Sequence, residues 1–146
     1  VIVAMNTMLQ EVIPNHVGRY TDAFYPTATG DNFQKLGFNT ILIESGHYPD
    51  DYIREVSRKF TFYAIFQGLY YIAKTDNFTS YKAYFKIPNN DKVFYDVIHR
   101  YSDSKNDLGY QFRDEIIENK LVSKLVKIEE TSLKGKFGHR EIVFEH

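Results

Sequence analysis

The chain has 146 residues, which is enough to bury a hydrophobic core, so one domain is the starting expectation. A hydrophobic content of 43% and a charged content of 25% are ordinary for a soluble globular protein. A formal net charge of −1 excludes the positive field that binding to nucleic acid or to an anionic membrane requires. The absence of cysteine excludes disulfides and thiolate metal ligands.

The first predicted element is a helix over residues 1–13, which Pro14 ends. Its apolar residues recur at helical spacing: Ile2, Met5, Leu9, Val12 and Ile13. Turn-forming residues follow, and a short helix is predicted over 31–36 with Gly37 just past its end.

A continuous apolar run, Ile41–Ile43, predicts a strand over 39–44 that is covered on both faces. Glu44 ends this strand, and ligands bind at the carboxyl edge of an α/β sheet. Glu44 is therefore a candidate catalytic carboxylate. The alternative is a structural carboxylate that caps the next helix or pairs with Arg54 or Arg58.

A long helix is predicted from 51 to 73, with Asp50 as its N-cap. We interpret its apolar stripe as core packing rather than as a cofactor site. The stripe consists of Ile53, Val56, Phe60, Tyr63, Phe66 and Tyr70. The apolar window 60–73 is too short to span a bilayer. No targeting stretch is apparent, which favours a cytoplasmic location without fixing it.

The second half of the chain has a different character and predicts a small antiparallel β unit over 81–146, after an α/β portion over 1–80. A hairpin is expected around Glu118–Lys120, and an exposed loop over 102–106. The predicted strands are 93–98, 110–117, 121–128 and 142–144. The expected fold class is α/β, with a partial sheet and covering helices followed by the β unit.

Several chemistries are excluded by missing motifs, because the sequence contains no GxGxxG, P-loop, GxSxG or HExxH. The five histidines include no pair four residues apart on a plausible helix, so no local two-histidine metal site is expected. Gly46 makes the Glu44–His47 segment a turn, so His47 is interpreted as a turn residue or a supporting group. His139 lies in a small basic cluster that is interpreted as a solvated face.

Three short motifs stand in a definite order. They are Gly18-Arg19-Tyr20, Tyr25-Pro-Thr-Ala-Thr-Gly30-Asp31-Asn-Phe33 and Thr40-Ile-Leu-Ile-Glu44-Ser-Gly46-His-Tyr-Pro-Asp50. Together with the long helix after them, they resemble the last third of a zinc carboxypeptidase of the carboxypeptidase A-like family, in its small bacterial branch. The resemblance covers residues 1–73 and implies a partial carboxypeptidase-like sheet.

The resemblance also implies roles for two residues. Enzymes of this family hold Zn²⁺ with two histidines and a glutamate and leave one position for water. Glu44 would take a proton from that water and pass it to the leaving amine. Tyr25 would close over the substrate and bind it. The substrate would be a peptide or, as in related deacylases, an acyl-amino acid.

The sequence departs from the family in one respect, because it contains no His-x-x-Glu zinc-binding motif. The zinc ligands and the substrate-binding arginines would lie upstream of Val1, where the chain begins inside an apolar periodic segment without a methionine. The expectation is therefore a C-terminal fragment that binds no metal, is inactive alone, and self-associates or lacks an N-terminal part. The alternative is a non-catalytic protein-interaction module in which Glu44 is structural.

Overall fold

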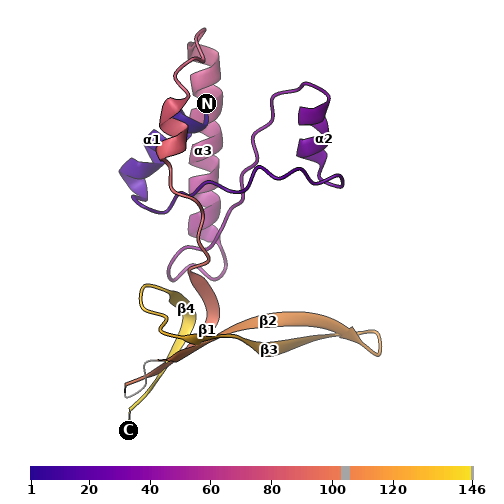
Figure 1. Ribbon diagram of the computed structural model, residues 1–146, viewed down its shortest axis with the longest axis vertical. Helices are drawn as coiled ribbons and strands as arrows, with labels where there is room; N and C mark the ends of the chain where they lie inside the picture. The colour runs from indigo at the N-terminus through magenta and orange to yellow at the C-terminus, as the bar shows by residue number, and fades with distance from the viewer. Residues whose placement is uncertain (103–105, 146) are drawn as a thin grey trace. The chain divides into compact units, whose positions relative to one another are not determined.

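A computed structural model describes residues 1–102 and 106–145 and confirms the mixed α/β class (Figure 1). The elements are α1 (Ile2–Val12), α2 (Thr29–Lys35), α3 (Glu55–Lys74), the 3₁₀ helix η1 (Lys82–Lys86), β1 (Phe94–Tyr101), β2 (Asp107–Ile117), β3 (Lys120–Thr131) and β4 (Phe137–Phe144). Residues 103–105 of the expected loop lie outside the described residues.

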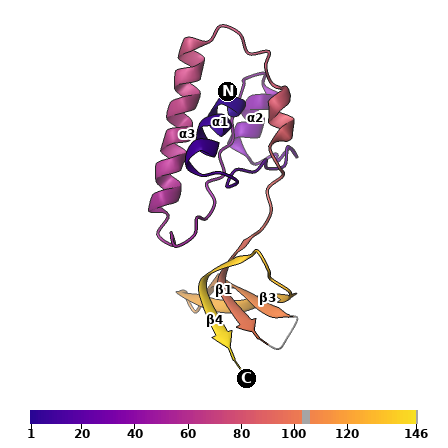
Figure 2. The ribbon, with the colours of Figure 1, turned by 90° about the vertical axis from the view of Figure 1, so that its left-hand side faces the viewer.

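The chain forms two compact units, which differ from the division expected after residue 80. The helical unit consists of Val1–Gly46 and Arg54–Asp91, and the sheet unit consists of His47–Ile53 and Lys92–His146. Among the described residues, the helices belong to the first unit and the strands to the second. Figure 2 labels α1, α2 and α3 of the helical unit and β1, β3 and β4 of the sheet unit. Within residues 1–102 and 106–145, no helix has both the length and the apolar character needed to cross a bilayer.

The centre of the helical unit is the packing of α1 on α3. The predicted helical spacing is confirmed in part: Met5, Leu9 and Ile13 are buried, whereas Ile2 and Val12 are 37% and 45% exposed. They face a small-residue side of α3, where Ala64 and Gly68 are buried one helical turn apart. A Cβ added at Gly68 would lie 3.2 Å from Met5 Sδ, so the absence of a side chain lets the two helices approach closely.

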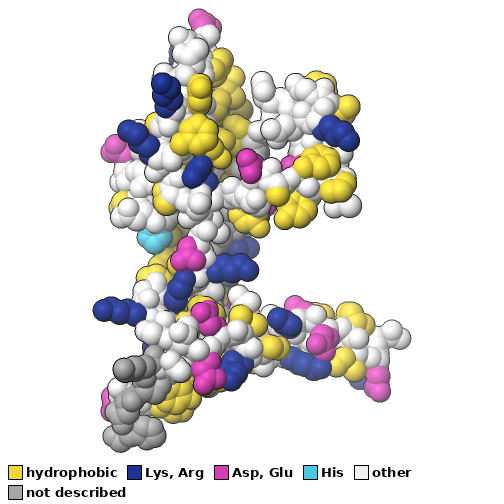
Figure 3. All heavy atoms as spheres, in the orientation of Figure 1, with side chains coloured by type: hydrophobic (Ala, Val, Ile, Leu, Met, Phe, Trp, Pro, Cys, Tyr) yellow, Lys and Arg dark blue, Asp and Glu magenta, His cyan; other side chains and the backbone are white. Residues whose placement is uncertain are grey.

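The aromatic stripe on α3 was expected to form a core, and this expectation is wrong for most of the helix. Phe66 is 61% exposed, and Tyr70 is 52% exposed. The reason is that α1 covers only the small-residue side, and no second layer covers the aromatic side among the described residues. Figure 3 shows part of this apolar surface over α3.

Helix α3 begins at Glu55, later than predicted, and Asp50 is not its N-cap. Asp50 and Arg54 both have left-handed backbone conformations, with φ of 56° and 65°. Left-handed backbone at these two positions prevents a right-handed helix from extending through the segment. Arg54 is the residue that directly precedes the helix.

The strand predicted over 39–44 does not form, which corrects a central expectation. These residues belong to no helix or strand. Ile41, Leu42 and Ile43 are 41%, 67% and 37% exposed, rather than covered on both faces. The physical reason is that a strand needs neighbours, and the described part of the helical unit contains no strand to pair with this one.

The sheet unit is a four-stranded mixed sheet with the order β3-β2-β1-β4. Strand β1 is central, antiparallel to β2 and parallel to β4, so the unit is not purely antiparallel as predicted. The β3–β4 connection crosses from one edge of the sheet to the other. It carries Leu133 into a fully buried position beside Tyr95 and Ile98, which together form the core of the unit.

The hairpin predicted around Glu118–Lys120 is confirmed. Ile117 and Lys120 are paired, and the two residues between them, Glu118 and Asn119, have φ of 50° and 61°. Positive φ at both central residues defines the type I′ turn, whose twist matches that of the flanking strands.

Candidate functional site

The Gly18–Tyr20 motif forms a junction within the helical unit. The Arg19 guanidinium donates from Nε to the Ile87 carbonyl at 2.8 Å and from Nη2 to the Asn89 side chain at 2.9 Å. The backbones of Arg19 and Asn89 also form a parallel bridge. A Cβ added at Gly18 would lie 2.8 Å from the Asn90 Cα, so only glycine fits there. The motif therefore holds two distant segments of chain together.

The Tyr25–Phe33 motif is a turn that holds itself in place. The Asp31 carboxylate accepts the backbone N–H of Tyr25 at 2.7 Å. The Asn32 side-chain amide donates to the carbonyls of Pro26 and Ala28 at 2.8 and 2.9 Å. These bonds fix the backbone at the start of α2 and leave Tyr25 56% exposed.

Glu44 lies in the irregular segment between α2 and α3, and its side chain is exposed. The sequence predicted that Glu44 lies at the edge of a sheet, and the structure does not place it there. Among the described residues its carboxylate makes no hydrogen bond or ion pair, and no contact joins it to Tyr25. Arg54 and Arg58 are not its partners, because Arg54 donates to the Ser45 carbonyl at 3.0 Å and Arg58 pairs with Glu55.

The residues directly after Glu44 are attached to the first turns of α3. Ser45 Oγ and Thr61 Oγ1 are hydrogen-bonded at 2.8 Å, and Thr61 also donates to the Ser57 carbonyl at 2.9 Å. With the Arg54 bond, these contacts anchor the chain immediately beside Glu44. The side chain of the candidate base is thus free to rotate on a fixed backbone position.

The sheet unit contains a histidine pair that sequence reasoning did not predict. His47 Nδ1 and His139 Nε2 lie 2.9 Å apart, at hydrogen-bond distance. The ring of Tyr52 packs edge-on against His139, with centroids 4.9 Å apart, and the ring of Phe94 stacks on His139 with centroids 5.9 Å apart. The two histidines are 92 residues apart in the chain, so no local signal connects them.

Arg100 lies at the centre of a polar cluster in the sheet unit. It donates to both carboxylate oxygens of Glu141 at 3.0 Å and to Asp107 at 3.0 Å. It also donates to the backbone carbonyls of Leu133 at 2.8 Å and Lys136 at 2.9 Å. This arrangement fixes the β3–β4 connection against β1 and occupies every N–H donor of the guanidinium.

The charged groups of this cluster shift one another's pKa values. The hydrogen bond from Arg100 lowers the pKa of Glu141 below its ordinary value, although partial burial works against it. Burial alone would raise the pKa of Asp107, but hydrogen bonds from Arg100 and from the backbone of Leu133 and Tyr101 bring it below the ordinary value. The pKa of Arg100 is raised, chiefly by its hydrogen bond to Glu141. All three groups are therefore held in their charged forms.

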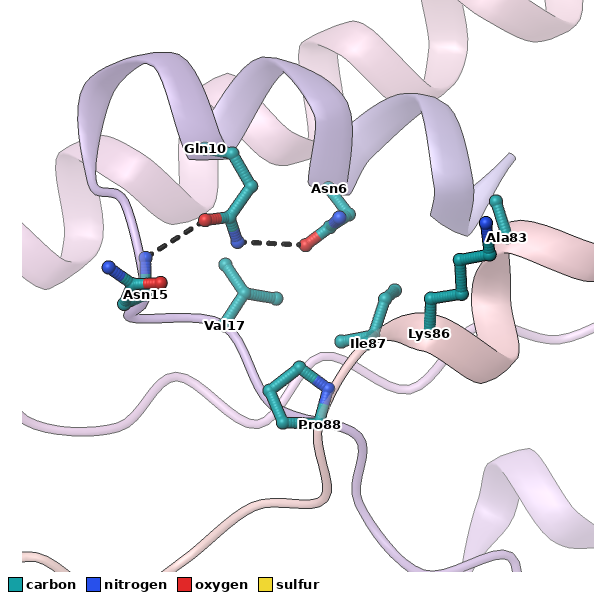
Figure 4. A pocket seen from close by; sticks show the side chains of 8 residues that line it. All are labelled: Asn6, Gln10, Asn15, Val17, Ala83, Lys86, Ile87 and Pro88. Atoms are coloured by element: carbon teal, nitrogen blue, oxygen red, sulfur yellow. Dashed lines mark hydrogen bonds between the residues drawn. The ribbon is translucent and has the colours of Figure 1, made fainter.

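An open hollow lies in the helical unit between α1 and η1 (Figure 4). Its floor carries two linked side-chain amides: Gln10 donates to Asn6 at 3.1 Å and accepts the backbone N–H of Asn15 at 2.9 Å. Lys86 supplies its only charge among the lining residues, and neither Glu44 nor Tyr25 lines it. The hollow therefore does not coincide with the predicted site.

A zinc site cannot be assembled from the part of the chain that the structure describes. It contains no group of three or more histidine, aspartate or glutamate side chains placed to hold a metal ion. These residues alone do not fit the zinc centre that the resemblance implies. No protein-family model, curated protein or solved structure matches the chain.

Proposed function

We propose that this chain is the C-terminal part of a zinc-dependent carboxypeptidase that hydrolyses C-terminal peptide bonds or related amide bonds. In this proposal Glu44 is the general base and Tyr25 binds the substrate. The metal ligands belong to the rest of the enzyme, and the chain alone is inactive. The observation that carries the proposal is the ordered set of motifs over residues 18–50 with a long helix after it.

The local structure of the second motif supports this role for Tyr25. The turn is fixed by Asp31 and Asn32, whereas the tyrosine side chain is exposed and available. A fixed backbone with a free side chain is what a substrate-closing residue requires, because closure then needs only side-chain rotation.

The exposure of Ile41–Ile43 supports the placement of Glu44. Two β-branched residues and a leucine in a row are suited to a buried strand, yet they lie exposed and unpaired among the described residues. We infer that they pair with strands of the complete catalytic domain. Glu44 would then stand at the end of a buried strand, where partial desolvation favours proton transfer near neutral pH.

The test is hydrolysis by the natural protein that contains this sequence. We expect it to release the C-terminal residue from a peptide with a free carboxylate and not from the same peptide with an amidated C-terminus. Treatment with a chelator should abolish the activity, and added Zn²⁺ should restore it. Hydrolysis of an N-acyl amino acid but not of the peptide would assign a deacylase instead. No zinc-dependent hydrolysis of either substrate would contradict the proposal.

A second candidate is a non-catalytic interaction module. One observation favours it, namely that the aromatic side of α3 is uncovered among the described residues, with Phe66 and Tyr70 61% and 52% exposed, although Glu44 itself makes no structural contact there. In that case the aromatic surface of α3 would serve partner contacts, and replacing Glu44 would change no activity.

A further inference from the structure

The histidine pair of the sheet unit joins two segments that are distant in the chain. Residues 47–53 belong to the sheet unit although they precede α3 in the sequence. His47 begins this segment, and its Nδ1 lies 2.9 Å from Nε2 of His139 on β4. His47 is exposed and His139 is half-buried, so the pair is accessible to water and to dissolved ions.

The backbone on both sides of His139 is fixed by the sheet. The preceding residue, Gly138, donates its N–H to the Glu141 carboxylate at 3.0 Å. A Cβ added at Gly138 would lie 2.9 Å from the Arg140 carbonyl oxygen, so only glycine fits at this position. The place of His139 is therefore set by β4 itself and does not depend on the hydrogen bond to His47.

Aromatic rings orient the two imidazoles. The Phe94 ring contacts both of them, with centroids 5.8 Å from His47 and 5.9 Å from His139. The Tyr52 ring packs edge-on against His139 from the same segment that carries His47. Groups that hold the rings of metal-binding histidines in one orientation strengthen metal binding. The packing around this pair supplies such support.

The separation of the two facing nitrogens is the one that a shared metal ion requires. Two metal–imidazole bonds of about 2.0–2.1 Å that meet at a right angle place the nitrogens about 2.9 Å apart. Bonds that meet at the tetrahedral angle place them about 3.3 Å apart. The observed 2.9 Å therefore matches neighbouring positions of a square-planar or octahedral ion.

The chemistry of the surroundings narrows the choice of ion. Within residues 1–102 and 106–145, no third histidine, aspartate or glutamate side chain joins the pair. Ca²⁺ and Mg²⁺ are bound through oxygen ligands such as carboxylates, and a structural zinc site uses four protein ligands. Imidazole nitrogens in a square-planar arrangement suit Cu²⁺, which also binds most strongly among the divalent ions of the first transition row.

We propose that His47 and His139 form a binding site for Cu²⁺, in which Nδ1 of His47 and Nε2 of His139 are neighbouring ligands and water fills the other positions. Both imidazoles are neutral in the bound state, and each carries its proton on the outer nitrogen. The ion replaces the hydrogen bond between the rings, so binding to the neutral pair requires only a change of tautomer in one ring.

This site goes beyond the proposed function and does not depend on it. The zinc of the proposed peptidase would be held by residues outside this chain, whereas both ligands of the copper site lie in the sheet unit. The competing interpretation is that the histidine pair is only a structural hydrogen bond, which attaches residues 47–53 to β4. That interpretation predicts no bound metal.

The test uses the full chain, with Cu²⁺ alone as the probe. Three matched variants replace a histidine with phenylalanine, which keeps an aromatic ring and removes both ring nitrogens. His47→Phe and His139→Phe each remove one proposed ligand. His99→Phe is the control on β1, where the ring packs against Tyr110 and Phe144 with centroids 4.7 and 5.1 Å away.

We expect isothermal titration calorimetry to show that His47→Phe and His139→Phe each raise the dissociation constant of the strongest Cu²⁺ site at least about tenfold, and that His99→Phe does not. Electron paramagnetic resonance should detect two coordinated imidazole nitrogens in the unmodified chain and one in each pair variant. Circular dichroism checks that each variant is folded, and the spectrum of the unmodified chain remains a test if a variant does not fold.

Three results would overturn the proposal. They are unchanged Cu²⁺ affinity in a folded pair variant, equal weakening by the control, and a spectrum of the unmodified chain without two imidazole nitrogens. Absence of Cu²⁺ binding would give the third result and leave the pair as a structural hydrogen bond. None of these results bears on hydrolysis by the natural protein, so the proposed function is tested separately.

Discussion

Arg100 shows how much one residue contributes to the sheet unit. Its guanidinium joins β1 to Asp107 at the start of β2, to Glu141 on β4 and to two carbonyls of the β3–β4 connection. The side chain is 22% exposed, so these bonds lie in a partly desolvated environment. Removing one partner from such a cluster leaves the other charges unsatisfied, which costs more than the pair itself contributes.

The two lowered carboxyl pKa values predict an acid-dependent stability. Because Asp107 and Glu141 have lower pKa values in the folded chain, their contribution is present above the ordinary carboxyl pKa of about 4 and is lost as the pH falls through the lowered values. We expect urea unfolding to show that the free energy of unfolding falls as the pH is lowered below about 4.

Arg100→Met should lower the free energy of unfolding by about 2–4 kcal/mol at neutral pH and should weaken its dependence on pH. Arg113→Met, on the exposed part of β2, is the control. An equal effect of both variants would contradict the role of Arg100.

At the scale of elements, the close contact between α1 and α3 depends on position 68 being a glycine, which has no side chain. Gly68 lets Met5 approach α3, and Ala64 extends the same small-residue side. Gly68→Leu should displace α1 and lower the unfolding free energy of the helical unit by about 1–3 kcal/mol. Ala73→Leu, exposed near the end of the same helix, should change it little. Helix loss in urea, followed by circular dichroism, measures both. A Gly68→Leu variant as stable as its control would show that the helices do not pack at this point.

The elements that the sequence predicted are those with local signals. Helix α1 follows from apolar spacing, the hairpin from its turn residues, and α2 from Gly37, whose φ is 91°. The parallel pairing of β1 with β4 joins residues about 40 positions apart, and no turn residue indicates it. The prediction of a strand over 39–44 was wrong. Its apolar pattern is typical of a buried strand, but whether a strand is buried depends on neighbouring strands and helices, which a local pattern does not specify.

The candidate site also contains one part that local sequence predicts and other parts that it does not. The Tyr25 motif is self-contained, since the bonds that hold it lie within nine residues, and its turn character could be predicted. The position of Glu44 was predicted from a buried strand, and the exposed, irregular structure of its segment corrects that sequence-based geometry. The pairing of His47 with His139 brings distant residues together and could not be predicted from spacing.

At the scale of the whole molecule, the chain combines a helical unit, which carries the three ordered motifs of residues 18–50, with a sheet unit, in which β2 and β3 stay paired beyond the end of their pairing with β1. Both units present apolar surface, which includes Phe66 and Tyr70 on α3, Ile116 on β2 and Leu121 on β3. Under our proposal for the function, the surface near Glu44 would be completed by the rest of a catalytic domain.

The measurement that tests the central claim most directly is the effect of Glu44→Gln on hydrolysis. The variant should be made in the natural protein that contains this sequence, supplied with Zn²⁺. It should be compared with Glu11→Gln, which removes an exposed carboxylate at the end of α1. The account predicts that Glu44→Gln lowers kcat at least about 100-fold with zinc content unchanged, and that Glu11→Gln does not. Full activity of Glu44→Gln would show that this carboxylate is not the general base and would contradict the account.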